Sequence, residues 1–442
     1  MLLVGGQPAA AESPTPAPLP GVAGPLQEWI ENTIPAPQLT PPPQTAPEPQ
    51  HLTGDDQTAL WKSVLSSPVG DPAFDAWPDD LDAMSPGQII ETRDVTAPAA
   101  TLIDAPIARA QLVKFRSTSA TGTPSFGTAT FLVPAVAWQG PDPRPVEVDT
   151  LPINALGLRC TPGYTLAHGD PDNKGINVFL PNVAAALNKG HAILIPDHEG
   201  PLVSYAEPNV AGHMTLDAIR AVRSSAPDEF ADSRFAVTGY SGGAIASYAT
   251  AMLLDEYAPE LAGVLVGAAA GGLVTDYGAV ARIFNGRTAS GILLSVSLAI
   301  AREHPEMLEY MNNLAQWVAT SPLKNICGEA DGPLGAVGIP LEVAASIDHP
   351  LDSEIAGHIE RLTDLTDRRS GVPLYIYHGA NDFWIPLEES RKMYGQQCGL
   401  GVTAQFRTVP GEHVSAMMNG AGGATDWIDA RLRGEPAPND CA

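Results

Sequence analysis

Apolar segments of two kinds follow one another along the chain from about residue 60. Residues 111–116 and 128–133 alternate between apolar and polar side chains, which is typical of half-buried antiparallel strands. Continuous apolar runs, typical of central parallel strands, cover residues 191–195, 234–238, 263–267 and 372–377. Helical periodicity lies between these runs, over residues 178–187, 215–223, 244–255 and 386–394. This alternation predicts an α/β fold with a mostly parallel central sheet and helices on both faces.

The interval 272–371 departs from this alternation, because it shows helical periodicity and little strand pattern. The periodicity is clearest over residues 292–302 and 306–318. We therefore expect a helical cap, or lid, at residues 272–371. It would be inserted into a core formed by residues 60–271 and 372–442.

Residues 1–50 differ in composition from the rest of the chain. Residues 1–11 resemble the end of a signal peptide with a small-residue cleavage site, although no basic residue precedes Lys62. The residues that follow are rich in proline, including the run at 41–43, and such tracts stay extended instead of packing a core. We expect a signal-peptide remnant and a Pro-rich, disordered tail over residues 1–50 of a secreted protein.

The balance of charge argues against one class of partner. The 442 residues include 24 Lys and Arg against 50 Asp and Glu, which gives a net charge of -26. Such an acidic surface repels phosphate backbones, so we expect no nucleic-acid partner. The longest apolar candidate for a membrane span, residues 289–301, is shorter than the ~20 residues that a bilayer requires. We therefore expect no integral membrane segment.

The cysteines form an even set of four without CxxC spacing: Cys160, Cys327, Cys398 and Cys441. Free thiols are expected in a cytosolic enzyme, whereas two disulfides are expected in an exported one. The signal-like N-terminus favours two disulfides. Spacing alone leaves all three pairings open.

A candidate nucleophile lies in the sequence Gly239-Tyr240-Ser241-Gly242-Gly243. The apolar run 234–238 leads directly into this sequence, and the helical segment 244–255 follows at once. A nucleophile elbow has this context, since a sharp turn lifts the serine hydroxyl clear of the sheet and small neighbours relieve backbone crowding. The alternative is a glycine-rich turn with a solvated serine. The context favours the elbow.

A serine hydroxyl needs a base, and the base needs an orienting acid, in the chain order Ser, Asp or Glu, then His in this kind of fold. Asp382 follows the run 372–377 and therefore stands at the carboxyl end of a central strand. His413 follows the strand-like run 403–409, which returns it to the same edge of the sheet. We expect Ser241, Asp382 and His413 to form a triad. The alternatives are a turn-forming aspartate and an ordinary loop histidine.

Two backbone N–H groups should stabilise the oxyanion that forms when Ser241 attacks a carbonyl. One is expected from Gly242, the residue after the nucleophile, and the other from a loop at the end of an earlier strand. The run 191–195 opens into such a loop at residues 196–200. A metal site at residues 197–199 is the alternative there, but it lacks a ligand spacing such as HExxH. We expect no metal and no cofactor.

Several short motifs between Asp71 and Cys441 together resemble the secretory lipase family, the group that includes the yeast lipase A type. They are Asp71-Pro-Ala-Phe, Pro86-Gly-Gln-Ile-Ile-Glu-Thr-Arg, Asp197-His-Glu-Gly, Gly239-Tyr-Ser-Gly-Gly-Ala, Tyr257-Ala-Pro-Glu-Leu, the loop around Asp382, and Glu412-His413. The resemblance implies an α/β-hydrolase fold with a helical lid and an exported lipase or esterase that uses the triad named above. It also implies an oxyanion hole formed by Asp197 and Gly242. The disulfides that it implies pair Cys160 with Cys327 and Cys398 with Cys441.

The leading hypothesis is therefore a secreted triacylglycerol lipase that cleaves carboxylic esters of lipids through an acyl-enzyme on Ser241. One alternative is a carboxylesterase that acts on short-chain or bulky non-lipid esters with the same triad. Another is a hydrolase-fold binding protein without turnover. Apolar cap residues 291–300 are expected to line the acyl site together with Phe383 and Trp384, which lie beside the acid. Contact with a lipid interface is expected to be transient and to favour neutral lipids.

Overall fold

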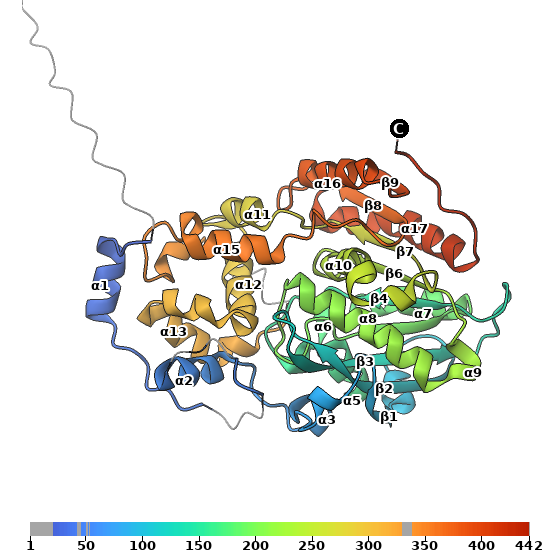
Figure 1. Cartoon of the computed structure of the whole chain (residues 1–442), viewed down its shortest axis with the longest axis horizontal. Helices are drawn as coiled ribbons and strands as arrows, with labels where there is room; N and C mark the ends of the chain where they lie inside the picture. The colour runs from blue at the N-terminus through green and yellow to red at the C-terminus, as the bar shows by residue number, and fades with distance from the viewer. Residues whose placement is uncertain (1–20, 42–45, 50–51, 53, 329–337, 442) are drawn as a thin grey trace, which may run out of the picture.

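A nine-stranded sheet forms the centre of the computed structural model, which describes residues 21–41, 46–49, 52, 54–328 and 338–441 (Figure 1). The strands of this described part are β1 (Ile89–Asp94), β2 (Ile107–Thr118), β3 (Pro124–Pro134), β4 (Val146–Thr150), β5 (Ala192–Pro196), β6 (Phe235–Tyr240), β7 (Leu265–Gly271), β8 (Leu374–Gly379) and β9 (Ala404–Val409). Their spatial order is β1-β2-β3-β5-β4-β6-β7-β8-β9. The pairs from β1 to β5 are antiparallel, and those from β5 to β9 are parallel.

Helices cover both faces of this sheet. Helices α8 (Pro208–Ser225), α10 (Gly242–Tyr257) and α16 (Leu387–Gly399) pack on one face. Helices α5 (Pro162–His168), α7 (Leu180–Asn188) and α17 (His413–Leu432) pack on the other. Successive strand residues point to opposite faces, so Phe235 and Val237 lie in the first core and Ala236 in the second. The α/β-hydrolase architecture predicted from the sequence is confirmed.

Short helices add further buried side chains to these two cores. They are α3 (Pro72–Asp75), α4 (Thr96–Ala99), α6 (Lys174–Asn177) and α9 (Pro227–Phe230). Strands β1 and β4 were not predicted, because each is short and carries acidic residues within its apolar pattern. Among the helices that the structure describes, none has the length and apolar character needed to cross a bilayer.

The described residues between β7 and β8 form helices joined by irregular segments, with no strand among them. Its helices are α11 (Tyr277–Phe284), α12 (Ser290–Glu303), α13 (Asn313–Thr320) and α15 (Glu354–Thr363). Figure 1 shows them gathered at one end of the molecule, beside the sheet. These four helices, with the described residues between them, are called the cap helices below.

A buried arginine joins the cap helices to the rest of the protein. Arg302 on α12 is fully buried, and its guanidinium donates to backbone carbonyl oxygens of five residues: Val64, Leu156, Leu202, Val203 and Lys324. A buried cation is tolerated only when its N–H groups find acceptors. This side chain therefore fixes α12 against the loop that follows β4 and against the N-terminal region.

The expectation of a disordered tail over residues 1–50 does not hold for the described part of that segment. Helix α1 (Pro25–Thr33) packs against the cap helices with Ile30 buried. Its C-terminal end is held by Asn313, which donates to the Ile34 carbonyl oxygen across 2.8 Å. Helix α2 (Asp55–Val64) lies nearby (Figure 1). Composition missed this packing because the surface that stabilises α1 comes from residues far away in the chain; the predicted signal remnant at residues 1–11 lies outside the described residues.

Candidate active site

Ser241 occupies the sharp turn between β6 and α10. Its backbone has φ +53° and ψ −119°, a region that residues with a side chain rarely adopt. A Cβ atom added to Gly239 would lie 2.3 Å from the carbonyl oxygen of Gly243, and one added to Gly243 would lie 1.9 Å from that of Thr150. Only glycine fits at these two positions. The turn therefore has the geometry of a nucleophile elbow.

His413 meets this serine from the far end of the chain. Its Nε2 lies 2.9 Å from Ser241 Oγ. His413 is the first residue of α17, and the preceding Glu412 side chain accepts from the backbone N–H groups of Val414 and Ser415. This N-terminal cap fixes the start of the helix and, with it, the position of the imidazole.

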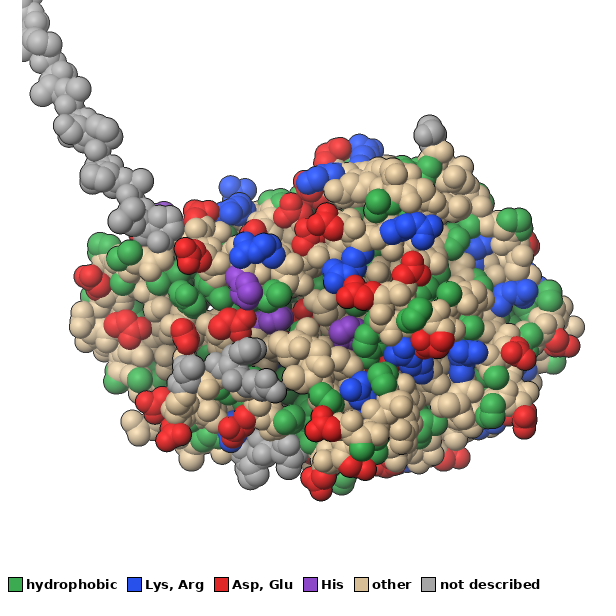
Figure 2. Space-filling view, viewed as in Figure 1, with side chains coloured by type: hydrophobic (Ala, Val, Ile, Leu, Met, Phe, Trp, Pro, Cys, Tyr) green, Lys and Arg blue, Asp and Glu red, His purple; other side chains and the backbone are tan. Residues whose placement is uncertain are grey.

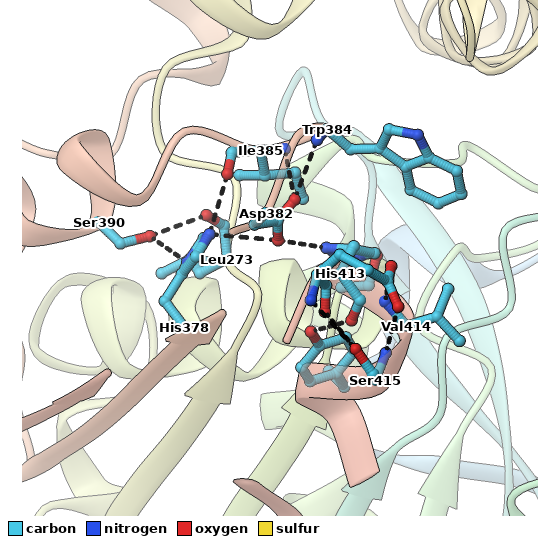
Figure 3. A network of polar contacts seen from close by, with 12 residues as sticks. Leu273, His378, Asp382, Trp384, Ile385, Ser390, His413, Val414 and Ser415 are labelled. Carbon is cyan, nitrogen blue, oxygen red and sulfur yellow. Dashed lines mark hydrogen bonds and ion pairs between the residues drawn. The ribbon is translucent and has the colours of Figure 1, made fainter. Parts of the chain in front are cut away.

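Asp382 completes the line of hydrogen bonds from the loop after β8 (Figure 3). Its Oδ2 lies 2.7 Å from Nδ1 of His413, while its Oδ1 accepts from the backbone N–H groups of Trp384 and Ile385. Burial alone would raise the pKa of Asp382, but hydrogen bonds from His378 and His413 lower it well below its usual 3.8. The side chain is therefore an ionised carboxylate at neutral pH.

The partner of each ring nitrogen assigns the hydrogens of His413. A carboxylate only accepts, so Nδ1 carries a hydrogen toward Asp382. In the neutral ring, Nε2 is then free to accept the hydroxyl hydrogen of Ser241. This arrangement can deprotonate a serine and stabilise the imidazolium that results, as nucleophilic catalysis of acyl transfer requires.

A cavity of about 850 Å³ opens at this line of residues. Ser241, Gly242 and His413 line one part of it, and the cap helices supply most of the rest. Side chains that line it from α11 and α12 are predominantly apolar, including Val280, Phe284, Ile292, Leu294 and Leu298. The serine therefore faces an apolar space of the size that ligand-binding sites commonly have.

Comparison with known proteins places this chain in a family. A family model described as secretory lipase matches residues 175–440. The chain belongs to the secretory lipase family. It is therefore a carboxylic ester hydrolase of the lipase type, as the resemblance of its motifs predicted.

Individual relatives of this secretory lipase agree over most of its length. Lipase 1 of Candida albicans is 27% identical over 398 residues, which cover 86% of this chain and 83% of that protein. A probable inactive lipase of Mycobacterium tuberculosis is 28% identical over 360 residues, or 79% of each chain. Among solved structures, Candida antarctica lipase A superposes with a TM-score of 0.76 at 21% identity, covering 86% of this chain and 89% of that one.

This secretory lipase contains both disulfides that the resemblance implied. Cys160 pairs with Cys327, and Cys398 pairs with Cys441. The first joins the region after β4 to the segment that follows α13. The second joins the end of α16 to the C-terminal residues. All four cysteines of the sequence are paired.

The structure does not support Asp197 as an oxyanion-hole residue. The backbone N–H of Asp197 donates to the carbonyl oxygen of Thr128 across 2.9 Å, so it already has an acceptor in the sheet. The buried carboxylate accepts from the Thr128 hydroxyl and from the N–H of Gly163, and Asp197 does not line the cavity. Burial raises the pKa of this carboxyl to about 7. Its environment is that of a structural residue beneath the loop.

A loop that the sequence analysis overlooked lies beside Gly242 instead. Asn154, in the loop after β4, lines the cavity, and a Cβ atom added to Gly242 would lie 2.0 Å from Asn154 Oδ1. Asn154 has a left-handed backbone with φ +48°. Such strain in a residue other than glycine is often found at functional sites. Gly242 itself is the first residue of α10, where the backbone N–H has no carbonyl partner within the helix.

The two aromatic residues predicted to line the substrate site have different positions. Trp384 lines the cavity, and its ring centroid lies 5.4 Å from that of His413. Phe383 is 60% exposed, does not line the cavity and packs its edge against Trp384. The side chains of adjacent residues in a turn point in different directions. Proximity to Asp382 in the sequence therefore could not predict that both Phe383 and Trp384 line the cavity.

Proposed function

We propose that this secretory lipase hydrolyses the ester bonds of neutral lipids, triacylglycerols in particular, through an acyl-enzyme on Ser241. The observation that carries the proposal is the hydrogen-bonded line Ser241–His413–Asp382 at the wall of an apolar cavity of about 850 Å³. Because a relative of similar identity is named a probable inactive lipase, the proposal depends on these side chains as well as on family membership.

The reaction begins when Nε2 of His413 takes the hydroxyl hydrogen of Ser241 and Oγ attacks the ester carbonyl carbon. The imidazolium is stabilised by the Asp382 carboxylate and then gives its proton to the departing alkoxide, which leaves as an alcohol. Water, deprotonated by the same imidazole, attacks the acyl-enzyme, and the fatty acid departs as Ser241 regains its proton.

The oxyanion of each tetrahedral intermediate needs two N–H donors. Gly242 is proposed as one, because its N–H opens the helix that follows the nucleophile. The loop 151–156 is proposed to supply the other, since its residue Asn154 lies against Gly242 and lines the cavity. The β4–β6 pairing supports this choice, because it brings the end of β4 directly beside the elbow.

The proposed acyl site is the part of the cavity that the cap helices line. We propose residues 272–371 as a cap domain and residues 60–271 and 372–442 as the core. Each methylene group buried there would contribute about 0.8 kcal/mol. Trp384 would form part of the wall beside His413.

Export of the enzyme and action at neutral lipid surfaces complete the proposal. Two disulfides and membership of a secretory family support export. The net charge of -26 disfavours anionic membranes. On the face drawn in Figure 2, acidic side chains are scattered among basic ones, with no large basic patch that would attract such a membrane.

The test combines covalent labelling with two substrates. A serine-directed phosphonate should modify wild-type enzyme at Ser241, as peptide mapping would show, and should leave Ser241→Ala unlabelled. Emulsified triolein should be hydrolysed at a rate comparable to or above that of soluble p-nitrophenyl acetate. Labelling at another serine would overturn the mechanism, and acetate turnover without triolein turnover would favour the carboxylesterase alternative.

A further inference from the structure

A second histidine contacts the proposed acid from the side opposite His413 (Figure 3). His378 lies on β8, four residues before Asp382, and its side chain is fully buried. Its Nε2 lies 3.0 Å from the Ile385 carbonyl oxygen and 3.3 Å from Asp382 Oδ2. Its Nδ1 lies 2.9 Å from Ser390 Oγ on α16. Both ring nitrogens therefore have partners, and the ring does not line the cavity.

The neighbours of Nε2 determine that it carries hydrogen. A carbonyl oxygen and a carboxylate oxygen can only accept, so a hydrogen must lie between Nε2 and these two atoms. At Nδ1, the Ser390 hydroxyl can donate to a neutral ring. It can otherwise accept from a charged ring while donating to the Leu273 carbonyl oxygen, 3.2 Å away. In both states the Nε2–H group faces Ile385 and Asp382.

The carboxylate of Asp382 consequently has donors on both oxygens. Oδ2 accepts from His413 and faces His378, and Oδ1 accepts from two backbone N–H groups, those of Trp384 and Ile385. His378 also holds the carbonyl of Ile385, so it restrains the same turn that supplies these N–H groups. Donors to both oxygens thus restrain the orientation of the carboxylate.

We propose that His378 is a positioning residue for the triad: it holds Asp382 in the orientation and charge state that His413 requires, while Ser390 holds the ring of His378. The proposal rests on the triad proposed above. One series of polar contacts then joins α16 to Ser241: Ser390–His378–Asp382–His413–Ser241. Other titratable groups near the Asp382–His413 pair are Tyr240 on β6 and Glu412 before α17.

Two variants of His378 separate the N–H donor from the volume of the ring. His378→Leu removes the donor, whereas His378→Gln keeps an N–H group near the position of Nε2. We expect His378→Leu to lower kcat about 10- to 100-fold, because a hydrogen bond to a charged group is lost. KM for a soluble p-nitrophenyl ester should stay within about twofold, since His378 does not line the cavity. His378→Gln should recover most of kcat.

The pH profile supplies a readout that a merely structural role would not move. With one donor fewer, the carboxylate holds the proton of the His413 imidazolium more tightly. The acid limb of kcat/KM should therefore move to higher pH by about half a unit in His378→Leu and return toward wild type in His378→Gln. Rates are referred to the concentration of phosphonate-titrated sites, so that a loss of folded protein does not count as a loss of kcat.

A matched control is the buried His191, which lies near the amino end of β5, far from the elbow. Its ring nitrogens contact the carboxylates of Glu147 and Asp429 at 3.0 and 2.9 Å. His191→Gln should leave kcat per titrated site and the acid limb unchanged. Should His378→Leu fail to fold, Ser390→Ala tests the same path by removing one hydroxyl. It should lower kcat about three- to tenfold and move the acid limb in the same direction.

The proposal is overturned if the purified variants keep kcat per titrated site within about twofold of wild type with an unshifted acid limb. It is also overturned if His378→Gln loses as much activity as His378→Leu. These failures differ from failure of the proposed function, because in that case Ser241→Ala would stay active and the wild-type enzyme would not be labelled at Ser241.

Discussion

Tyr240, the residue before Ser241, donates its hydroxyl hydrogen to the backbone carbonyl oxygen of His413 across 2.5 Å. The two rings also lie close, with centroids 5.3 Å apart. This bond joins β6 to the first turn of α17. The strand that leads into Ser241 therefore also holds the backbone of His413.

Removing this hydroxyl should make the position of His413 less restrained without creating a cavity in the core. In Tyr240→Phe the ring still packs, but one buried hydrogen bond is lost. We expect kcat to fall about three- to tenfold and the free energy of unfolding to fall by about 1 kcal/mol. Kinetics on p-nitrophenyl butyrate and urea unfolding measure the two effects. Tyr375→Phe, a buried tyrosine farther along the sheet, is the control, and equal effects of both changes would contradict the role of Tyr240.

Ser241 and His413 should act as one unit. Ser241→Ala and His413→Ala should each lower kcat by several orders of magnitude, because neither can form the acyl-enzyme without the other. The double variant should be little worse than either single one. Kinetics of all three proteins on one soluble ester, with circular dichroism to verify folding, make the comparison. Losses that multiply in the double variant would argue against a shared step.

Asp382→Asn should lower kcat almost as severely, because the amide can donate to His413 and thereby favour the wrong tautomer. It should also change stability in acid. The folded-state pKa of Asp382 lies below its usual 3.8, so its ionised form stabilises the fold at pH values above about 5 and this contribution is lost as the pH falls below 3.8. Between pH 6 and pH 3, wild type should therefore lose more unfolding free energy than Asp382→Asn. Parallel urea-unfolding curves over that range would contradict the assignment.

Asp197 should have the opposite pH dependence. Burial raises its folded-state pKa to about 7, so its stabilising contribution is complete below about pH 4 and is lost as the pH rises through 7. Asp197→Asn removes the ionisation. Relative to this variant, wild type should lose about 1 kcal/mol or more between pH 5 and pH 9 in urea unfolding. The control is Asp82→Asn, a change at an exposed carboxylate, whose unfolding free energy should vary with pH as that of wild type does. If the unfolding free energy of Asp197→Asn also varies as that of wild type does, the Asp197 carboxyl does not titrate as expected.

The cavity should determine the preferred acyl chain. Activity on p-nitrophenyl esters should rise from acetate toward medium and long chains, since each buried methylene contributes about 0.8 kcal/mol. Leu294→Gln and Leu298→Gln, which place an amide in the cavity wall, should reduce the long-chain preference more than acetate turnover. Leu362→Gln, on α15 but outside the lining, is the control. Acetate as the best substrate, or equal losses on every ester, would make the cap helices structural.

The succession of most strands and helices along the chain, and the position of the elbow, could be predicted from local sequence patterns. Periodicity identified β2, β3 and β5 to β9, and the strand–glycine–serine–helix context around Ser241 required only neighbouring residues. Asp382 and His413 followed from their positions after strands, because parallel strands present their carboxyl ends at one edge of the sheet. The disulfide pairing was predicted from the resemblance of motifs, because the spacing of the cysteines left all three pairings open.

Tertiary structure alone decided which loop lies beside Gly242. Strand β5 precedes β6 in the chain among the predicted strands, yet the unpredicted strand β4 lies between them in the sheet. This order brings Asn154 to the elbow and leaves Asp197 bonded to Thr128. The sequence by itself determined the fold class and led to the three side chains of the proposed triad, because both depend on local patterns. Their partners could not be predicted in this way. Tyr240 meets His413 through packing between segments 173 residues apart. His378 lies only four residues before Asp382, but its contact depends on the side-chain rotamers, which no local pattern encodes.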